Sequence, residues 1–415
     1  MLTRSNNPPK RLRLTAIFLF IFAVLNFSND PASADETKTN LANKDHQLHY
    51  FHTSYDQSFE HLNRITDSLY TLRPTPIRTD LIIDNDDRIQ TIYFPPKSKP
   101  SHIIVFTSGT HGIEGFTGSA VQLFLMDQLI PRLRRENLGV LMIHGLNPWG
   151  FKNRRRVTKN NVDLNRNFMI DSKDFSTNNQ SYKNLTAFLN PKTPVSRRFL
   201  DRAWFYIQSG YYLFRYSMHS LRQSILEGQY EIPKGIYYGG NSYEPQVEII
   251  EREIDKITAP YSRILFIDLH TGYGKNGELH LFPDQIDDQP TKELLTDIFR
   301  GSVIDFGDTK DFYSVKGGYV NYFYQRYRTK KTFIPMVFEY GTSDSQEIFG
   351  ALFSLRTMIL ENQGFQNGYS TLADQKKTWE NFDRLFYPSD PEWRKQTLRE
   401  TEKILEKSIT RFMKI

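Results

Sequence analysis

The sequence predicts an α/β protein in which helices cover a central sheet. Short, continuous apolar runs at Ile103–Thr107 and Val140–His144 are typical of strands buried in the middle of a sheet, and a helical segment lies between them. Similar runs return at Arg263–Leu269 and Thr332–Phe338. This repeated rhythm of strand, loop and helix favours a sheet with helices packed against it.

The remaining elements follow from local signals. Pro131 ends a helix that starts near Thr117, and Asp390 caps a C-terminal helix that has Pro391 at its first position. A polar lead-in is expected over residues 35–60. The other predicted elements are, in chain order, a helix near Tyr55–Leu72, strands at Leu81–Ile83 and Ile89–Tyr93, a helix over Thr117–Leu129, and helices at Pro245–Ile257 and Thr291–Gly301.

Residues 171–260 differ from the rest of the chain in composition and in the pattern of apolar residues. Asp171–Lys183 is polar and predicts a loop, Ser196–Glu227 is aromatic and basic with helical spacing, and Tyr237–Gly240 marks a turn. We expect an elaboration over the edge of the sheet. The pattern is equally compatible with a wall of the substrate site and with a packing insert that does not reach the site.

The length and net charge of the chain limit the number of domains and the classes of partner that can be expected. The chain has 415 residues with 39% hydrophobic content, which suits one large α/β domain or two smaller ones, and we predict a single catalytic domain over residues 35–415. The net charge is +6, and half of it lies in the first 34 residues. The rest of the chain is therefore close to neutral and gives no case for nucleic-acid binding.

Residues 1–34 have the pattern of an export signal. Basic residues precede an apolar stretch from Leu14 to Phe27, and Ala32-Ser33-Ala34 matches a small-x-small cleavage site. The pattern predicts cleavage after Ala34 and a periplasmic or secreted protein without stable membrane association. An uncleaved membrane anchor is the alternative. The chain contains no cysteine, so neither a disulfide framework nor a thiol nucleophile is available.

A histidine pair and a carboxylate predict a metal site. His111 and Glu114 lie three residues apart in the loop after Ile103–Thr107, and His270 follows Arg263–Leu269. Ligands of open α/β sheets bind at the carboxyl ends of strands, so these side chains can converge. Catalytic zinc takes three protein ligands and one water. We therefore predict one Zn²⁺ on His111, Glu114 and His270, although His270 could instead cap a loop or helix.

Further polar residues supply the chemistry of a hydrolase. Glu339 ends an apolar strand, where partial desolvation would raise its pKa and suit it to general-base work; a salt bridge to a neighbouring arginine is the plainer interpretation. Arg156 can stabilise the oxyanion that develops on an attacked carbonyl. Arg166 and Asn165 can bind a substrate carboxylate. Asp163 can accept the remaining ring N–H of a zinc-bound histidine.

At these residues the chain resembles the zinc carboxypeptidase superfamily, the M14 metallopeptidases, and is most similar to its DUF2817 branch. The matching blocks run in the expected order from about residue 100 to 345. They are Gly109–Gly115, Asn147–Gly150, Arg155-Arg156, Asn161–Phe168, Asp268–Gly272 and Glu339–Thr342.

The resemblance implies a three-layer α/β/α fold around a mixed sheet of roughly eight strands. It implies zinc binding by His111, Glu114 and His270, with Glu339 as general base and later proton donor. Asn165 and Arg166 would hold a substrate carboxylate. Arg156 would support the carbonyl oxyanion and Asp163 would steady His111.

The chain departs from the family pattern in three places. Thr158-Lys159 stands where a glutamate or asparagine is expected, which leaves the anion preference open. The usual substrate-side tyrosine matches no single tyrosine here. Residues 171–260 differ strongly from the digestive carboxypeptidases, so their substrate preferences do not transfer.

Together these features predict an exported zinc hydrolase that cuts an amide bond near a free carboxylate, with peptides as the first candidate substrates. A deacylase of N-acyl amino acids, like aspartoacylase and succinylglutamate desuccinylase, would use the same metal and base. A non-catalytic binding module with a vestigial metal site is the alternative from another class.

Overall fold

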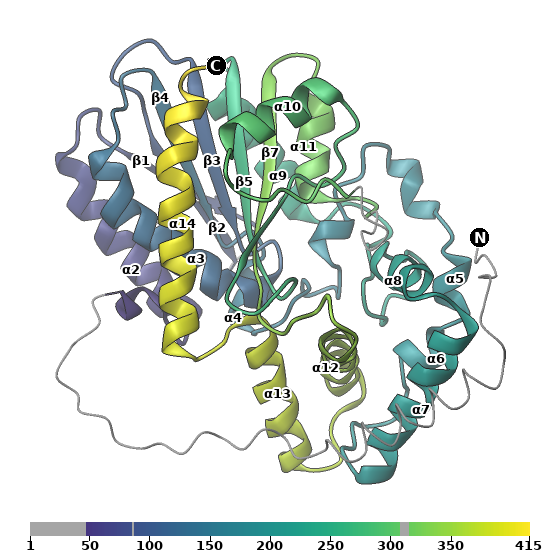
Figure 1. The fold of residues 1–415 in the computed structure, drawn as a ribbon. Helices are drawn as coiled ribbons and strands as arrows, with labels where there is room; N and C mark the ends of the chain where they lie inside the picture. Colours follow the sequence, from purple (N-terminus) through teal and green to yellow (C-terminus); the bar gives the residue numbers. More distant parts are fainter. Residues whose placement is uncertain (1–46, 85–86, 308–314) are drawn as a thin grey trace.

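A seven-stranded mixed sheet forms the centre of the computed structural model, which describes residues 47–84, 87–307 and 315–415 (Figure 1). The strands lie in the order β1-β2-β4-β3-β5-β7-β6. The four strands β4, β3, β5 and β7 run parallel, whereas β1, β2 and β6 pair antiparallel with their neighbours. Their bounds are β1 (Ile77–Ile82), β2 (Arg88–Phe94), β3 (His102–Ser108), β4 (Leu138–His144), β5 (Arg263–Thr271), β6 (Leu279–Phe282) and β7 (Thr332–Tyr340).

The sheet matches the predicted class, with two differences in detail. The mixed α/β arrangement is confirmed, with seven strands in the described residues where roughly eight were expected. Every residue of β3 and β4 is buried, as their unbroken apolar sequences predicted for central strands covered on both faces. The short edge strand β6 was not predicted, because its four residues are too few to show a clear alternation of apolar and polar side chains.

Helices cover both faces of this sheet and complete the three layers (Figure 1). One face carries α3 (Gly115–Phe124), which packs on β3, β4 and β5 and is itself covered by α2 (Tyr55–Ser68) and α14 (Pro391–Phe412). The other face carries α9 (Pro245–Thr258) and α11 (Tyr319–Tyr327). There the ring of Phe266 on β5 lies 5.4 Å from that of Phe323 on α11, which fixes the helix against the strand.

The ends of several helices follow the predicted signals. Asp390 accepts a hydrogen bond from Glu392 N at the start of α14, and Pro391 is its first residue. The predicted helix over Thr117–Leu129 begins earlier, at Gly115, and passes into a π-helical turn, η4 (Leu125–Leu129). The remaining helices near the sheet are α4 (Pro148–Lys152), α10 (Gln289–Ile298), and the short turns η1 (Leu48–Tyr50), η2 (Leu69–Thr71), η3 (Gly112–Glu114), η5 (Ile130–Arg132) and η6 (Leu164–Arg166).

The part of the 171–260 block that precedes α9 forms a helical layer beside the sheet (Figure 1). Its predicted first loop, Asp171–Lys183, contains short helical turns instead, because Asp171 and Asn179 each cap one. These helices face α12 and α13 across a cavity described below. Their bounds are η7 (Ser172–Ser176), α5 (Gln180–Lys183), α6 (Thr186–Leu189), α7 (Phe199–Arg215), α8 (Met218–Leu226), α12 (Ile348–Asn367) and α13 (Leu372–Phe386).

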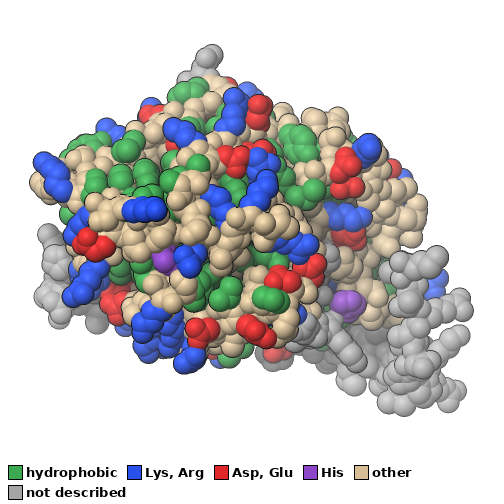
Figure 2. Space-filling model, turned by 90° about the horizontal axis from the view of Figure 1, so that it is seen from above, with side chains coloured by type: hydrophobic (Ala, Val, Ile, Leu, Met, Phe, Trp, Pro, Cys, Tyr) green, Lys and Arg blue, Asp and Glu red, His purple; other side chains and the backbone are tan. Residues whose placement is uncertain are grey.

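The predictions for the N-terminus concern residues that the structure does not describe. The signal peptide at residues 1–34 and the start of the catalytic domain at residue 35 lie outside the described residues. Within the part of the chain that the structure describes, no helix has both the length and the apolar character needed to cross a bilayer. On the face seen in Figure 2, basic, acidic and apolar side chains are interspersed.

Candidate metal centre

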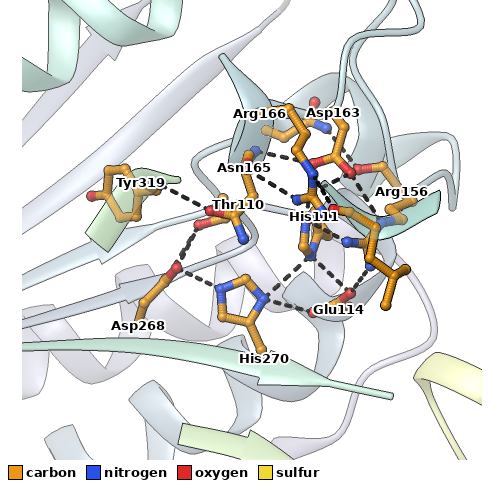
Figure 3. A network of polar contacts seen from close by, with 12 residues as sticks. Thr110, His111, Glu114, Arg156, Asp163, Asn165, Arg166, Asp268, His270 and Tyr319 are labelled. Carbon is orange, nitrogen blue, oxygen red and sulfur yellow. Dashed lines mark hydrogen bonds and ion pairs between the residues drawn. The ribbon is translucent and has the colours of Figure 1, made fainter. Parts of the chain in front are cut away.

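Three side chains from two neighbouring strands meet at one edge of the sheet (Figure 3). His111 and Glu114 lie in the loop and η3 turn after β3, and His270 lies near the end of β5. Strands β3 and β5 are parallel neighbours, so their carboxyl ends reach the same edge. His111, Glu114 and His270 are 3%, 1% and 4% exposed, which takes the cluster out of bulk water.

The donor atoms of these residues lie close enough together to hold one metal ion. His111 Nδ1 lies 2.9 Å from Glu114 Oε1, His270 Nδ1 lies 3.0 Å from Glu114 Oε2, and the two Nδ1 atoms are 3.2 Å apart. Two ligands bound at the usual zinc distances of about 2.0–2.1 Å in a tetrahedron are about 3.3 Å apart. The chemistry and the spacing of the three donors therefore fit a zinc ion.

Each histidine contacts a buried carboxylate through its other ring nitrogen. His111 Nε2 lies 3.1 Å from Asp163 Oδ1, and His270 Nε2 lies 2.5 Å from Asp268 Oδ2. This carboxylate–histidine pairing fixes the ring orientation and leaves both Nδ1 lone pairs for a metal. Asp268 was not predicted, but its signal was present, because residues two apart on a strand point to the same face.

Charge in the cluster is balanced tightly. Burial raises the pKa of Asp163, but Arg156, His111 and Arg166 outweigh burial and hold that pKa well below its usual value. Burial lowers the pKa of His270, but Asp268 and Glu114 raise it well above the usual value for histidine. Binding a metal at His270 Nδ1 would therefore release a proton.

Backbone hydrogen bonds join the loop of the ligands to the loop of Arg156. Gly112 N donates to Arg156 O at 3.1 Å, and Ile113 N donates to Arg155 O at 2.9 Å. Only glycine fits at position 112, because an added Cβ would lie 2.1 Å from the carbonyl carbon of Gly150. The two loops are thus held as one unit.

Arg156 lies over the ligand cluster. Its Nη1 donates to Glu114 Oε1 at 2.8 Å and its Nε lies 3.4 Å from Asp163 Oδ2. Its Nη2 is 2.8 Å from His111 Nε2, a contact that competes with the donation from that nitrogen to Asp163. Because a metal on Nδ1 requires a proton on Nε2, we expect Nη2 to move away when metal binds and to point into the cavity.

Glu339 stands beside the ligands without belonging to them. It is the register partner of His270 on the parallel strand β7, and its Oε1 accepts a hydrogen bond from Tyr273 N at 2.9 Å. Burial, and next the charge of Glu114, raise the pKa of Glu339 to about 8. Oε2 accepts no hydrogen bond from the described residues, so this oxygen is available for a proton.

Asn165 and Arg166, the two residues predicted to bind a substrate carboxylate, differ in how many of their N–H groups are free to bind a substrate. Asn165 Oδ1 accepts from Tyr319 N at 2.9 Å, and its Nδ2 donates to no described residue while the side chain lines the cavity. Arg166 is 2% exposed, and both its Nε and its Nη2 donate to Leu226 O. Arg166 therefore braces α8, and its role toward a substrate carboxylate stays a prediction.

Two further residues of the site were not predicted. Tyr237, placed in a turn by the sequence, lines the cavity with a positive φ of +55°, and the Arg156 and Arg166 guanidiniums lie 5.8 and 5.5 Å from the centre of its ring. Its hydroxyl donates to no described residue. Asp284 also lines the cavity, and burial raises its pKa to about 6. Neither had a sequence signal, because both lie in irregular segments.

The metal cluster opens into a cavity. The cavity has a volume of about 210 Å³. Its lining joins His111, Glu114, His270, Arg156 and Glu339 to apolar side chains of the 171–260 block and of α12. The 171–260 block is therefore a wall of the site in this structure rather than a packing insert remote from it.

Comparison with solved structures gives matches of low identity. A metallo-carboxypeptidase from Burkholderia cenocepacia is 9% identical with a TM-score of 0.42, covering 79% of this chain and 70% of its own. Bovine thrombin-activatable fibrinolysis inhibitor, in complex with tick carboxypeptidase inhibitor, is 11% identical with a TM-score of 0.41, covering 80% and 98%. Carboxypeptidase A from Helicoverpa armigera is 13% identical with a TM-score of 0.40, covering 94% and 82%. All three TM-scores lie below 0.5.

Comparison with curated proteins gives no match. Comparison with protein families gives one that spans most of the chain, since the family described as "Protein of unknown function (DUF2817)" matches residues 84–400. This range includes the three donor residues, their carboxylate partners and Glu339. The protein is therefore a member of the DUF2817 family.

Proposed function

We propose that the protein is a zinc-dependent hydrolase that cleaves an amide bond near a free carboxylate, with peptides as first candidate substrates. The observation that carries the proposal is the cluster of His111, Glu114 and His270 with Glu339 beside it. Three donors that can hold one metal ion, plus a buried carboxylate that is not a donor, are the parts that metal-assisted hydrolysis requires.

A zinc ion bound by these donors would act as a Lewis acid toward a carbonyl oxygen and lower the pKa of a bound water. Asp163 and Asp268 hold the two imidazoles in the orientation that the metal needs. Proton release from His270 on binding makes the affinity of the site for metal rise with pH.

The remaining steps fall to residues around the cluster. Glu339 would take the proton of the attacking water at Oε2 and later deliver it to the leaving amine, a role that its raised pKa of about 8 suits. Arg156 Nη2, released from His111, would donate to the oxyanion of the attacked carbonyl. Asn165 Nδ2 would donate to the substrate carboxylate, with Arg166 behind it supplying positive charge.

A second candidate function is deacylation of N-acyl amino acids. It uses the same donors and the same base, and differs in which side of the scissile bond carries the carboxylate. The apolar character of the cavity wall favours this candidate, because a hydrocarbon acyl group needs no hydrogen-bond partners there.

The test begins with metal content. We expect the purified full-length protein to bind one zinc per chain and to hydrolyse at least one substrate from panels of peptides and N-acyl amino acids. Hydrolysis of N-acyl amino acids but of no peptide would rule out the proposal that the protein is a peptidase. A chain that cannot be loaded with zinc under any condition would instead be a binding module with a vestigial site.

We also propose that the protein acts outside the cytoplasm. The support is the basic, apolar and small-residue pattern of residues 1–34. N-terminal sequencing of the protein from its native host checks this: a mature chain that starts at Asp35 supports export with cleavage, and an intact Met1 contradicts cleavage.

A further inference from the structure

The cavity beside the metal cluster extends far beyond the reacting groups. Its walls away from the cluster come from two segments that are distant in sequence, the α7–α8 helices and α12. Arg222 on α8 donates to the carbonyl oxygens of Ser345 and Gln346 just before α12, which ties the two walls together. The walls are therefore a built part of the fold rather than a chance gap.

Apolar side chains from both walls face this space. They are Leu213, Leu221 and Ile225 from α7 and α8, and Leu352, Leu355 and Met358 from α12. Leu221, Ile225, Leu352 and Met358 are all buried, so these side chains are held in place by their neighbours in the walls. An apolar cavity with a few polar groups at one end is the usual form of a small-molecule site.

The serine hydroxyls and the arginine guanidinium on these walls are already engaged within the protein. Ser209 donates to Phe205 O at 2.8 Å, and Ser354 lies 3.2 Å from Ser343 Oγ. Ser345 Oγ accepts from Gly274 N at 2.9 Å, and Arg222 is held by the carbonyls named above. On the wall, the Tyr212 hydroxyl donates to no described residue. Asn165 Nδ2 and the Tyr237 hydroxyl also donate to none, and both lie on the part of the lining that includes the metal cluster.

The engaged polar groups discriminate between possible occupants. A peptide bound in the cavity would place one N–H and one C=O against the walls for every residue. Each of these groups that finds no hydrogen-bond partner there makes binding less favourable, because it has lost its hydrogen bonds to water. A linear hydrocarbon chain has no such groups and gains free energy with every methylene that leaves water.

We propose that the cavity between α8 and α12 binds a linear aliphatic acyl chain of eight or more carbons, carried by an amide substrate whose carboxylate end lies at the metal cluster. The substrate class is that of long-chain N-acyl amino acids. This inference rests on the proposed hydrolase function for its reaction, but not for its binding site. No atom of the hydrocarbon chain reacts; water adds to the amide carbonyl, the C–N bond breaks, and a fatty acid and an amino acid leave.

Binding tests the site without catalysis. Metal-free, full-length protein is titrated by calorimetry with N-acetyl-, N-octanoyl- and N-dodecanoyl-glycine. We expect the dodecanoyl compound to bind at least about 100-fold more tightly than the acetyl compound, because about ten further methylenes are buried. Equal affinities across the series, or no binding of the long-chain compounds, would overturn the proposal.

Two substitutions in the walls locate the bound chain. Leu213→Gln places an amide on the cavity face of α7, and Ala351→Phe fills space at the start of α12. Both should remove most of the advantage of dodecanoyl- over acetyl-glycine while zinc still binds one per chain. The matched control is Leu200→Gln on the outer face of α7, where the side chain is 77% exposed, and it should leave the advantage intact. An unchanged advantage in both wall variants would place the chain elsewhere.

Turnover separates this proposal from the hydrolase function. With zinc bound, kcat/KM should rise about two- to fourfold for each added methylene until the cavity is filled. Chain-length-dependent binding without any turnover supports the site and contradicts the hydrolase. Turnover of acetyl compounds or peptides without dependence on chain length supports the hydrolase and contradicts the acyl site.

Discussion

His270 and Glu339 are register partners on the parallel strands β5 and β7. One is a candidate metal ligand and the other is the candidate base, so the separation between ligand and base is set by the hydrogen-bond ladder of the sheet rather than by a loop. A sheet is the stiffest part of an α/β fold, and proton transfer depends steeply on such separations. The pairing makes Glu339 the first residue to test.

Glu339→Gln should keep one zinc per chain and lower kcat by about 10²–10⁴-fold, because the amide cannot take a proton from water. Metal analysis and steady-state kinetics measure the two effects separately. Glu248→Gln, on the exposed surface of α9, serves as the control and should change neither. Turnover near that of the unmodified protein would contradict the role assigned to Glu339.

Asp268→Asn should weaken zinc binding by about 10–100-fold, because the amide no longer takes the charge-assisted hydrogen bond from His270 Nε2. Competition with a chromogenic chelator gives the affinity. The substitution preserves size, and Thr107 and Thr110 can still donate to the remaining oxygen. Asp163→Asn should act in the same direction through His111, whereas unchanged affinity in both variants would show that the carboxylates do not support the ligands.

Gly112→Ala should destabilise the fold by about 3 kcal/mol and abolish tight zinc binding, because the new methyl group meets the backbone of Gly150 and Phe151. Thermal unfolding with and without zinc measures both effects. Gly301→Ala provides the contrast: nothing lies within 4 Å of its added Cβ, and only its positive φ of +92° opposes the change, at about 1 kcal/mol. Equal behaviour of the two variants would contradict the close approach at Gly112.

His144, at the end of β4, should make the protein less stable in mild acid. Burial lowers the pKa of His144 to about 3, so the folded state keeps it neutral while the unfolded state takes up a proton below the ordinary pKa of about 6.5. Above pH 6.5 His144 does not change the stability. As the pH falls from 6.5 toward 3, protonation of His144 in the unfolded state lowers the free energy of unfolding by about 1.4 kcal/mol per pH unit.

Comparison with His144→Gln isolates this effect from other titrating groups. Between pH 7.5 and pH 5, denaturant unfolding of the unmodified protein should lose about 2 kcal/mol more than the variant loses. Parallel pH profiles would mean that His144 is protonated in the folded protein or not buried in it.

Much of the candidate site could be predicted because its residues follow strands. Buried strands have unbroken apolar sequences and parallel strands end at one edge, so polar residues at the carboxyl ends of β3, β5 and β7 come close together. The sequence could not reveal the hydrogen bonds from Arg166 to Leu226 O, or the entry of Tyr237 into the cavity. Those depend on how irregular segments fold over the sheet, which no periodicity encodes.

The apolar cavity was beyond sequence reasoning for a related physical reason. Leu221 on α8 and Leu355 on α12 look like ordinary core residues, and only their placement on opposite walls turns them into a lining. The sequence therefore left two interpretations open for residues 171–260. A pattern of apolar residues predicts that a face is buried but does not predict against what.

The hydrogen bonds from Gly112 to Arg156 and from Ile113 to Arg155 have a consequence for re-engineering. A designer who wished to transplant this chemistry into another scaffold could not move the loop that carries His111 and Glu114 alone. The backbone of that loop is held in shape by hydrogen bonds to the loop that carries Arg156. The two would have to be transferred together, about 45 residues apart in the chain but inseparable as a template.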